Sequence, residues 1–208
     1  MRASHPFPLP RLHAITDERV ARRADLAEVA AGLAAGGSAE LAFHARGRTL
    51  SGLEHFELAV RLSAFPPARL FVNDRLDVAL AAGAVGVQLG AGSLAPEVAR
   101  QLNSRWWIGR SVHAIHEAEA ALAAGADYLL VGPVFATPTH AEREPLGLDA
   151  FRRIAEVGLP VVAIGGVTPD TVAGLKAAGA YGVAAIRALW DAAEPVAAAR
   201  RMVMELKS

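Results

Sequence analysis

The feature that most constrains the fold of this chain is a sequence pattern that occurs four times. An alanine-rich segment, a glycine and a short apolar segment follow one another at residues 34–43, 81–89, 123–131 and 177–186. Glycine suits the end of a helix because the chain there turns through a left-handed conformation in which a Cβ would clash. An apolar strand without alternation is typical of a parallel sheet covered by helices. The repeat therefore predicts an α/β fold, with a barrel as the leading candidate.

Eight apolar segments alternate with helical segments along the whole chain. The expected strands are 12–16, 40–45, 69–72, 85–89, 106–109, 127–131, 160–164 and 182–186. No linker or shift in composition interrupts this rhythm, so we expect one domain over residues 1–208, a single (β/α)8 TIM barrel. A doubly wound open sheet is the alternative, but no G-x-G-x-x-G motif opens a helix to support a dinucleotide site.

Composition excludes several classes of function. The 21 basic and 21 acidic side chains balance, so no overall field favours nucleic acid or acidic membranes as partners. The chain has no cysteine, which excludes disulfides, thiol nucleophiles and cysteine-ligated metals. Residues 1–10 lack the apolar core of a signal peptide, and charges interrupt every apolar stretch before it reaches the roughly 20 residues of a membrane span. We expect a cytoplasmic protein.

In a TIM barrel the active site forms where the carboxyl ends of the strands meet. The polar residues that directly follow the expected strands are therefore the candidates for chemistry. They include Asn73, Asp74, Ser111, Thr137 and Thr139, together with the arginines, histidines and glycines discussed below. We expect a small-molecule site on this rim.

Gly165 and Gly166 follow the seventh expected strand and precede a helix. Backbone without side chains lets a phosphate approach the amides, and the loops after strands seven and eight are the usual phosphate site of such barrels. We expect this pair, with Ile186 and Arg187 after the eighth strand, to bind a phosphate. A tight turn without a ligand is the alternative.

Arg46 and Arg48 alternate after the second expected strand. Each guanidinium can bind a carboxylate or phosphate with a fork of donors, which suits an anionic substrate, whereas a solvated loop is the alternative. Asp74 has no second carboxylate to share a Mg²⁺ ion, since Ser93 stands at the corresponding place after the next strand. We therefore expect Asp74 to cap the helix that follows it.

His44, His113 and His140 belong to the expected rim, and an imidazole that titrates near neutral pH suits proton transfer. His13 lies inside the first expected strand, and His55 is expected at the surface. No pair has the H-x-x-x-H spacing of a zinc site, so no metal is expected.

Four segments, 14–17, 73–77, 132–139 and 163–169, resemble the thiamine phosphate synthase superfamily. They read Ala-Ile-Thr-Asp, Asn-Asp-Arg-Leu-Asp, Gly-Pro-Val-Phe-Ala-Thr-Pro-Thr and Ala-Ile-Gly-Gly-Val-Thr-Pro, and the likeness runs in collinear order along nearly the whole chain. The resemblance implies a phosphorylated thiazole as the substrate and a homodimer as a possible assembly. It implies either of two activities. A synthase joins hydroxymethylpyrimidine diphosphate to thiazole phosphate with Mg²⁺, whereas a TenI-type tautomerase aromatises a thiazole carboxylate phosphate by moving a proton.

The synthase branch has Gln-x-Arg-x-Lys where this chain has His44-x-Arg46-x-Arg48. It also has an aspartate at the position of Ser93 and a lysine at that of His140. These departures fall on diphosphate and metal binding, which the synthase reaction needs. The resemblance therefore predicts a thiazole tautomerase, an isomerase that needs no cofactor.

Under this hypothesis His140 moves the proton, because Pro133 replaces the histidine that the tautomerase branch has after the sixth strand. His113 or His44 are the alternatives. The arginines bind the carboxylate. The side chains that line the pocket are Asn73, Ser111, Thr137 and Thr139. A synthase with an altered Mg²⁺ site and a non-catalytic barrel that binds thiazole or thiamine phosphate stay open as alternatives.

Overall fold

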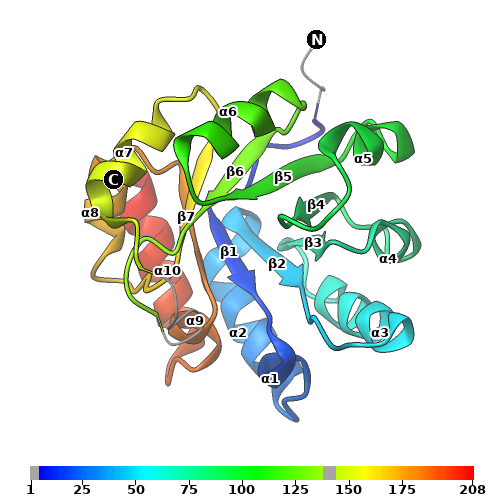
Figure 1. The fold of residues 1–208 in the computed structure, drawn as a ribbon. Helices are drawn as coiled ribbons and strands as arrows, with labels where there is room; N and C mark the ends of the chain where they lie inside the picture. The colour runs from blue at the N-terminus through cyan, green and yellow to red at the C-terminus, as the bar shows by residue number, and fades with distance from the viewer. Residues whose placement is uncertain (1–4, 138–143) are drawn as a thin grey trace.

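The computed structural model describes residues 5–137 and 144–208 of the chain. In these residues eight parallel strands pair in sequence order, and β8 pairs with β1 to close the barrel (Figure 1). The strands are β1 (Leu12–Ile15), β2 (Leu41–Ala45), β3 (Arg69–Asn73), β4 (Gly86–Leu89), β5 (Trp107–Val112), β6 (Tyr128–Val131), β7 (Val161–Ile164) and β8 (Gly182–Ala185). The expected α/β class and the TIM barrel are confirmed.

Helices surround the barrel on the outside (Figure 1). They are α1 (Glu18–Ala21), α2 (Leu26–Gly37), the 3-10 helix η1 (Ser38–Glu40), α3 (Gly52–Ser63), α4 (Leu76–Ala81), α5 (Pro96–Leu102), α6 (Ile115–Ala123), α7 (Gly147–Ala155), α8 (Val172–Ala177), α9 (Arg187–Trp190) and α10 (Pro195–Lys207). Helices α2 and α10 approach closely at Gly36, which has no side chain. A Cβ at this position would lie 2.3 Å from the carbonyl oxygen of Val196. Among the described residues, no helix has the length and apolar character that a membrane span requires.

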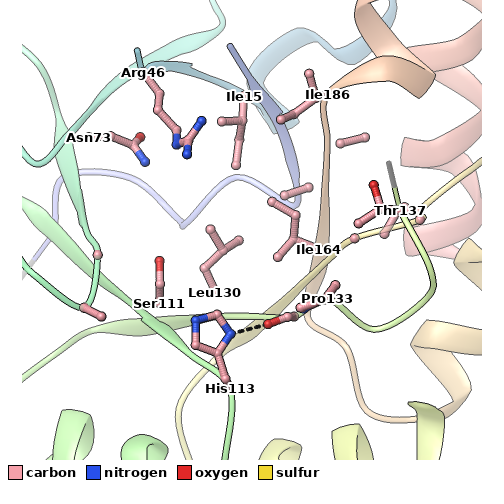
Figure 2. Close-up of a pocket in the computed structure, with 18 of the residues that line it drawn as sticks. Ile15, Arg46, Asn73, Ser111, His113, Leu130, Pro133, Thr137, Ile164 and Ile186 are labelled. Carbon is pink, nitrogen blue, oxygen red and sulfur yellow. Dashed lines mark hydrogen bonds between the residues drawn. The ribbon is translucent and has the colours of Figure 1, made fainter. Parts of the chain in front are cut away.

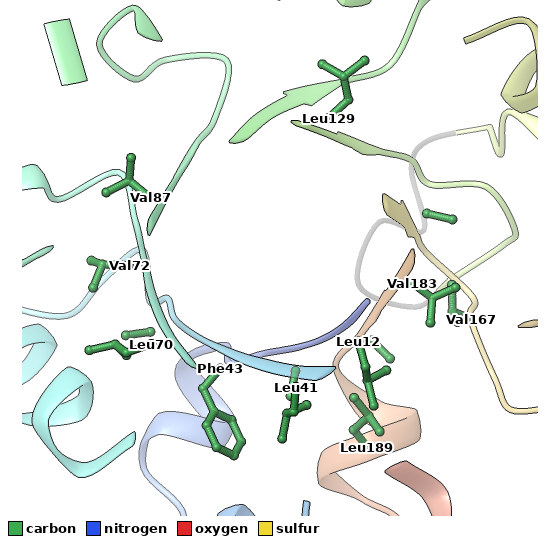
Figure 3. Packing of buried hydrophobic residues seen from close by; sticks show 14 of the residues in the cluster. Leu12, Leu41, Phe43, Leu70, Val72, Val87, Leu129, Val167, Val183 and Leu189 are labelled. Carbon is green, nitrogen blue, oxygen red and sulfur yellow. The ribbon is translucent and has the colours of Figure 1, made fainter. Parts of the chain in front are cut away.

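The strands are buried on both faces, as the absence of alternation in the sequence predicts. On β2, Leu41 and Phe43 point outward to the helices, whereas Ala42 and His44 alternate with them and point into the barrel. Figure 3 shows the outward-pointing side chains of several strands in the layer between strands and helices. This layer is the main hydrophobic core, and a smaller cluster fills the barrel itself.

Glycines on the inner face of the barrel make room for two aromatic rings. A Cβ at Gly86 would lie 2.3 Å from Cε1 of Phe71, and one at Gly109 would lie 2.2 Å from Cζ of Tyr128. The interior is therefore filled by large side chains, each of which lies over a glycine on the neighbouring strand. This filling forms a solid floor beneath the carboxyl ends of the strands.

The substitution Gly109→Ala is expected to lower the free energy of unfolding by about 2 kcal/mol, because the new methyl group must displace the Tyr128 ring in a filled interior. Urea denaturation measures the change. Gly174→Ala on α8 is the control, since nothing lies within 4 Å of its added Cβ and alanine favours a helix. A Gly109→Ala variant with the urea midpoint of the wild-type protein would show that the interior is loosely packed.

Candidate active site at the carboxyl ends of the strands

The carboxyl ends of the strands enclose a cavity of about 1140 Å³, to which all eight strands or their following loops contribute (Figure 2). Most of the predicted site residues line it. They are Arg46, Arg48, Asn73, Ser111, His113, Thr137, Gly165, Gly166, Ile186 and Arg187. Thr139 and His140 lie outside the described residues. His44 does not line the cavity.

Two properties require glycine at Gly165 and Gly166. Both have positive φ angles, 96° and 66°, which side chains rarely adopt. In addition, a Cβ at Gly165 would lie 2.5 Å from Cα of Pro133, and one at Gly166 would lie 2.6 Å from Cβ of Phe135. The amide N–H groups of the pair donate no hydrogen bond to another described residue. Amides of this kind on a cavity wall suit an anion such as a phosphate.

Arg46 supplies positive charge on another part of the wall (Figure 2). The hydroxyl of Thr16 fixes its backbone, because Oγ1 donates to the Arg46 carbonyl over 2.8 Å and accepts from the Arg46 N–H over 2.9 Å. Burial and the nearby Arg48 guanidinium lower the pKa of Arg46, but a guanidinium remains charged in proteins. A partly desolvated cation of this kind binds an anionic ligand more strongly than a solvated one.

Asp74 does not cap the helix after it, so that prediction is wrong. Its φ of 63° lies in the left-handed region, which aspartate tolerates better than most residues, and Arg75 occupies the N-cap position of α4. The carboxylate instead reaches the loop after β4. There, Oδ1 accepts a hydrogen bond of 2.9 Å from the Gly90 N–H and another from the Ser93 hydroxyl.

The oxygen atoms of Asp74 and Ser93 fit a Mg²⁺ site in which a bound phosphate group completes the coordination of the ion. Both line the cavity, and Asp74 Oδ2 has no hydrogen-bond partner among the described residues. Mg²⁺ is commonly held by one or two carboxylates together with substrate phosphates and water. Within the described ranges, no group of three or more His, Cys, Asp or Glu side chains could hold a metal by itself.

The sequence predicts His44 at the rim, but the residue is fully buried below the cavity. It lies one inward-pointing position before Arg46 on the same chain, so Arg46 reaches the cavity and His44 does not. Its Nε2 lies 2.8 Å from Nδ1 of His13, and its Nδ1 lies 3.1 Å from the carboxamide of Asn73. His55 is buried as well, contrary to its expected place at the surface.

Of the predicted histidines, His113 is the one that the described residues place on the cavity wall (Figure 2). Its Nδ1–H donates to the carbonyl of Gly132, and its backbone N–H donates to Glu117 over 2.6 Å. These contacts fix the ring at the end of β5. Its catalytic role stays a prediction.

The buried imidazole of His13 is expected to make stability depend on pH. Desolvation lowers the pKa of His13 from 6.5 to about 4, despite its bond to the Pro10 carbonyl. Below pH 6.5 the unfolded chain therefore binds a proton that the folded chain does not bind until about pH 4. The contribution of His13 to the free energy of unfolding falls by about 2 kcal/mol between pH 7 and pH 5.

Urea denaturation of the wild-type protein and of His13→Asn at several pH values measures this contribution as the difference between the two profiles. The wild-type protein should lose more stability than the variant as the pH falls. Parallel profiles would contradict a neutral, buried His13.

The fold and the site together define the class. The protein is a TIM barrel whose cavity combines the backbone amides of a glycine pair, three arginines and a carboxylate, as suits phosphorylated small molecules. The family model described as thiamine monophosphate synthase, TMP-TENI, matches residues 12–189. The chain belongs to this family.

Similar proteins bear the names of the synthase branch of this family. A protein named thiamine-phosphate synthase from Methanoregula boonei is 42% identical over 193 residues, covering 91% of this chain and 89% of that protein. One of the same name from Moorella thermoacetica is 43% identical and covers 84% and 85%. The solved structure of thiamine phosphate pyrophosphorylase from Pyrococcus furiosus matches with a TM-score of 0.82 and 32% identity, covering 95% of each chain.

These relatives overturn the predicted thiazole tautomerase activity and its isomerase class, because their names are those of a synthase, which is a transferase. The prediction gave too much weight to His44 and Ser93. His44 does not line the cavity, so its difference from glutamine removes no direct contact with a ligand there. Ser93 keeps an oxygen beside the Asp74 carboxylate where the synthase branch has a second aspartate.

Proposed function

We propose that this protein is a thiamine-phosphate synthase that joins hydroxymethylpyrimidine diphosphate to thiazole phosphate and releases diphosphate. The observation that carries the proposal is the 42% identity, over nine-tenths of the chain, to proteins of that name. The arrangement of charges and hydrogen-bond donors in the cavity supports it.

The cavity offers separate regions for two anionic substrates. Arg46 and Asn73 lie on one side of it, whereas Thr137 and Ile186 lie on the other (Figure 2). We assign the side with the arginines and Asp74 to the diphosphate of the pyrimidine. The glycine pair, with Arg187, is assigned to the phosphate of the thiazole. Both substrates then share one cavity, where the reacting atoms can be held together.

In the reaction, the bond between the pyrimidine methylene carbon and the diphosphate oxygen breaks, and diphosphate leaves with the bonding electrons. The thiazole nitrogen supplies the electron pair of the new carbon–nitrogen bond. Arg46 and Arg48 would neutralise charge on the leaving group. Electrostatic stabilisation of developing charge is usually the largest single contribution that a protein makes to catalysis. A Mg²⁺ ion held by Asp74 and Ser93 would supply further positive charge to the diphosphate.

The test is to incubate the purified protein with both substrates and Mg²⁺ and to measure thiamine phosphate by chromatography. Product should require both substrates and should disappear when EDTA removes the metal. Binding of both substrates without product would contradict the proposal.

A further inference from the structure

A chain of hydrogen-bonding side chains runs from the floor of the barrel to the cavity wall. His13 Nε2 lies 2.9 Å from the Pro10 carbonyl oxygen, and His13 Nδ1 lies 2.8 Å from His44 Nε2. His44 Nδ1 lies 3.1 Å from the carboxamide of Asn73, which lines the cavity. Both imidazoles are fully buried. The reaction proposed above gives neither of them a direct role.

The Pro10 carbonyl determines where the proton of His13 lies. A carbonyl oxygen only accepts hydrogen bonds, so His13 Nε2 must carry the proton. Burial lowers the pKa of His13 to about 4, so the ring is neutral near neutral pH and Nδ1 carries a lone pair. The contact between the two rings needs one donor, and His44 Nε2–H is therefore that donor.

The same reasoning extends to His44. Burial, and then the neighbouring His13, lower its pKa well below the usual value, so this ring is also neutral. Its single proton lies on Nε2, which leaves a lone pair on Nδ1. That lone pair points at Asn73, while the His44 ring stacks on Phe71 with the ring centroids 5.1 Å apart.

A lone pair on His44 Nδ1 requires a donor from Asn73. The carboxamide oxygen at 3.1 Å would place two acceptors against each other. A half-turn about the last side-chain bond exchanges the oxygen and the nitrogen without changing the shape of the group. Only one orientation of the carboxamide gives each hydrogen bond from Pro10 to Asn73 one donor and one acceptor. In that orientation the Asn73 N–H donates to His44 and the oxygen faces the cavity.

We propose that His13 and His44 are positioning residues that orient the Asn73 carboxamide so that its oxygen accepts a hydrogen bond from the amino group of an aminopyrimidine substrate. The identity of that substrate rests on the proposed function. The reverse orientation would present an N–H to the cavity and would favour an oxopyrimidine. The buried imidazoles thus select the amino over the oxo form, although neither touches the substrate, because an unpaired buried polar group disfavours the wrong analogue.

The proton positions can be measured directly. Long-range ¹H–¹⁵N correlation spectra of the labelled full-length protein distinguish the two neutral forms of an imidazole from its cation. At neutral pH, His13 and His44 should both be neutral with the proton on Nε2. A His44 that carries protons on both nitrogens, or on Nδ1 alone, would overturn the proposal.

Two substitutions of His13 separate positioning from a purely structural role. The glutamine amide of His13→Gln reaches the place of Nε2 and can keep the bond to Pro10, whereas the asparagine amide of His13→Asn reaches the place of Nδ1 and can keep the bond to His44. Each variant loses one buried hydrogen bond, so we expect similar losses of stability. The KM for the pyrimidine diphosphate should rise about tenfold in His13→Gln and less than about threefold in His13→Asn. Equal increases in the two variants would overturn the positioning role.

A separate binding measurement keeps this inference distinct from the proposed function. Calorimetry with the aminopyrimidine alcohol, and with its oxo analogue, needs no turnover. His13→Gln should bind the amino compound more weakly and lose its preference over the oxo compound, whereas His13→Asn should keep that preference. His55→Gln, which changes a buried imidazole bonded to the Ala45 carbonyl, is the control. A wild-type protein that forms no thiamine phosphate but shows this pattern would refute the synthase activity alone, and a preference unchanged in His13→Gln would refute the inference.

Discussion

The substitution Asp74→Asn is expected to lower the rate of thiamine phosphate formation by at least about a hundredfold, the size of effect seen when one group that stabilises developing charge is removed. Asparagine keeps the acceptor for the Gly90 N–H and the Ser93 hydroxyl, and it tolerates the positive φ of 63°. The fold should therefore survive. What disappears is the negative charge that would hold Mg²⁺ beside the diphosphate.

Steady-state rates measured over a range of Mg²⁺ concentrations test this prediction. The variant should need much more Mg²⁺ for half-maximal rate, and its urea midpoint should match that of the wild-type protein. Asp77→Asn is the matched control, because Asp77 is an exposed carboxylate nearby on α4 that pairs with Arg75. Equal losses in the two variants would show that Asp74 has no special role at the metal.

The substitution Gly166→Ala is expected to raise the KM for thiazole phosphate by about a hundredfold, since a displacement of about 1 Å at a binding site can have that effect. The new methyl group would lie 2.6 Å from Cβ of Phe135 and 2.7 Å from the carbonyl oxygen of Ala136. The loop after β7 must therefore move, and its amides move away from the phosphate. The KM for the pyrimidine diphosphate should change little.

Gly125→Ala separates this effect from ordinary backbone strain. Gly125 also has a positive φ, 79°, but nothing lies within 4 Å of its added Cβ. Both variants should lose stability because alanine disfavours this conformation by about 1 kcal/mol. Only Gly166→Ala should alter the KM for thiazole phosphate. An unchanged KM for thiazole phosphate in Gly166→Ala would show that the glycine pair does not bind the phosphate.

Much of the fold could be predicted from the sequence because the information is local. A glycine after a helix and a run of apolar residues are properties of neighbouring positions, and each unit predicts one helix and one strand. Repeating the unit along the chain leaves few ways to bury every strand on both faces. The glycine pair Gly165–Gly166 is also visible in the sequence, because two glycines between an apolar strand and a helix are typical of a loop whose backbone approaches an anion.

The residues that the sequence misplaced are those whose role depends on neighbours far along the chain. Asp74 reads as a helix cap from its local position, but the barrel brings the loop with Gly90 and Ser93 beside it. His44 reads as a rim residue because it ends an apolar run. Only the pairing of β1 with β2 brings His13 against His44, and only the position of the cavity shows that Arg46 lines it whereas His44 does not.

The sequence by itself determined the barrel, the end of the barrel where the cavity with most of the candidate site residues lies, and the superfamily. The tertiary structure decided which polar side chains reach the cavity and which stay buried. The relatives overturned the predicted tautomerase and support the proposed synthase. The physical reason is that helix and strand propensities act between residues a few positions apart. Hydrogen bonds such as that between His13 and His44, on the other hand, form only after the two strands are placed side by side.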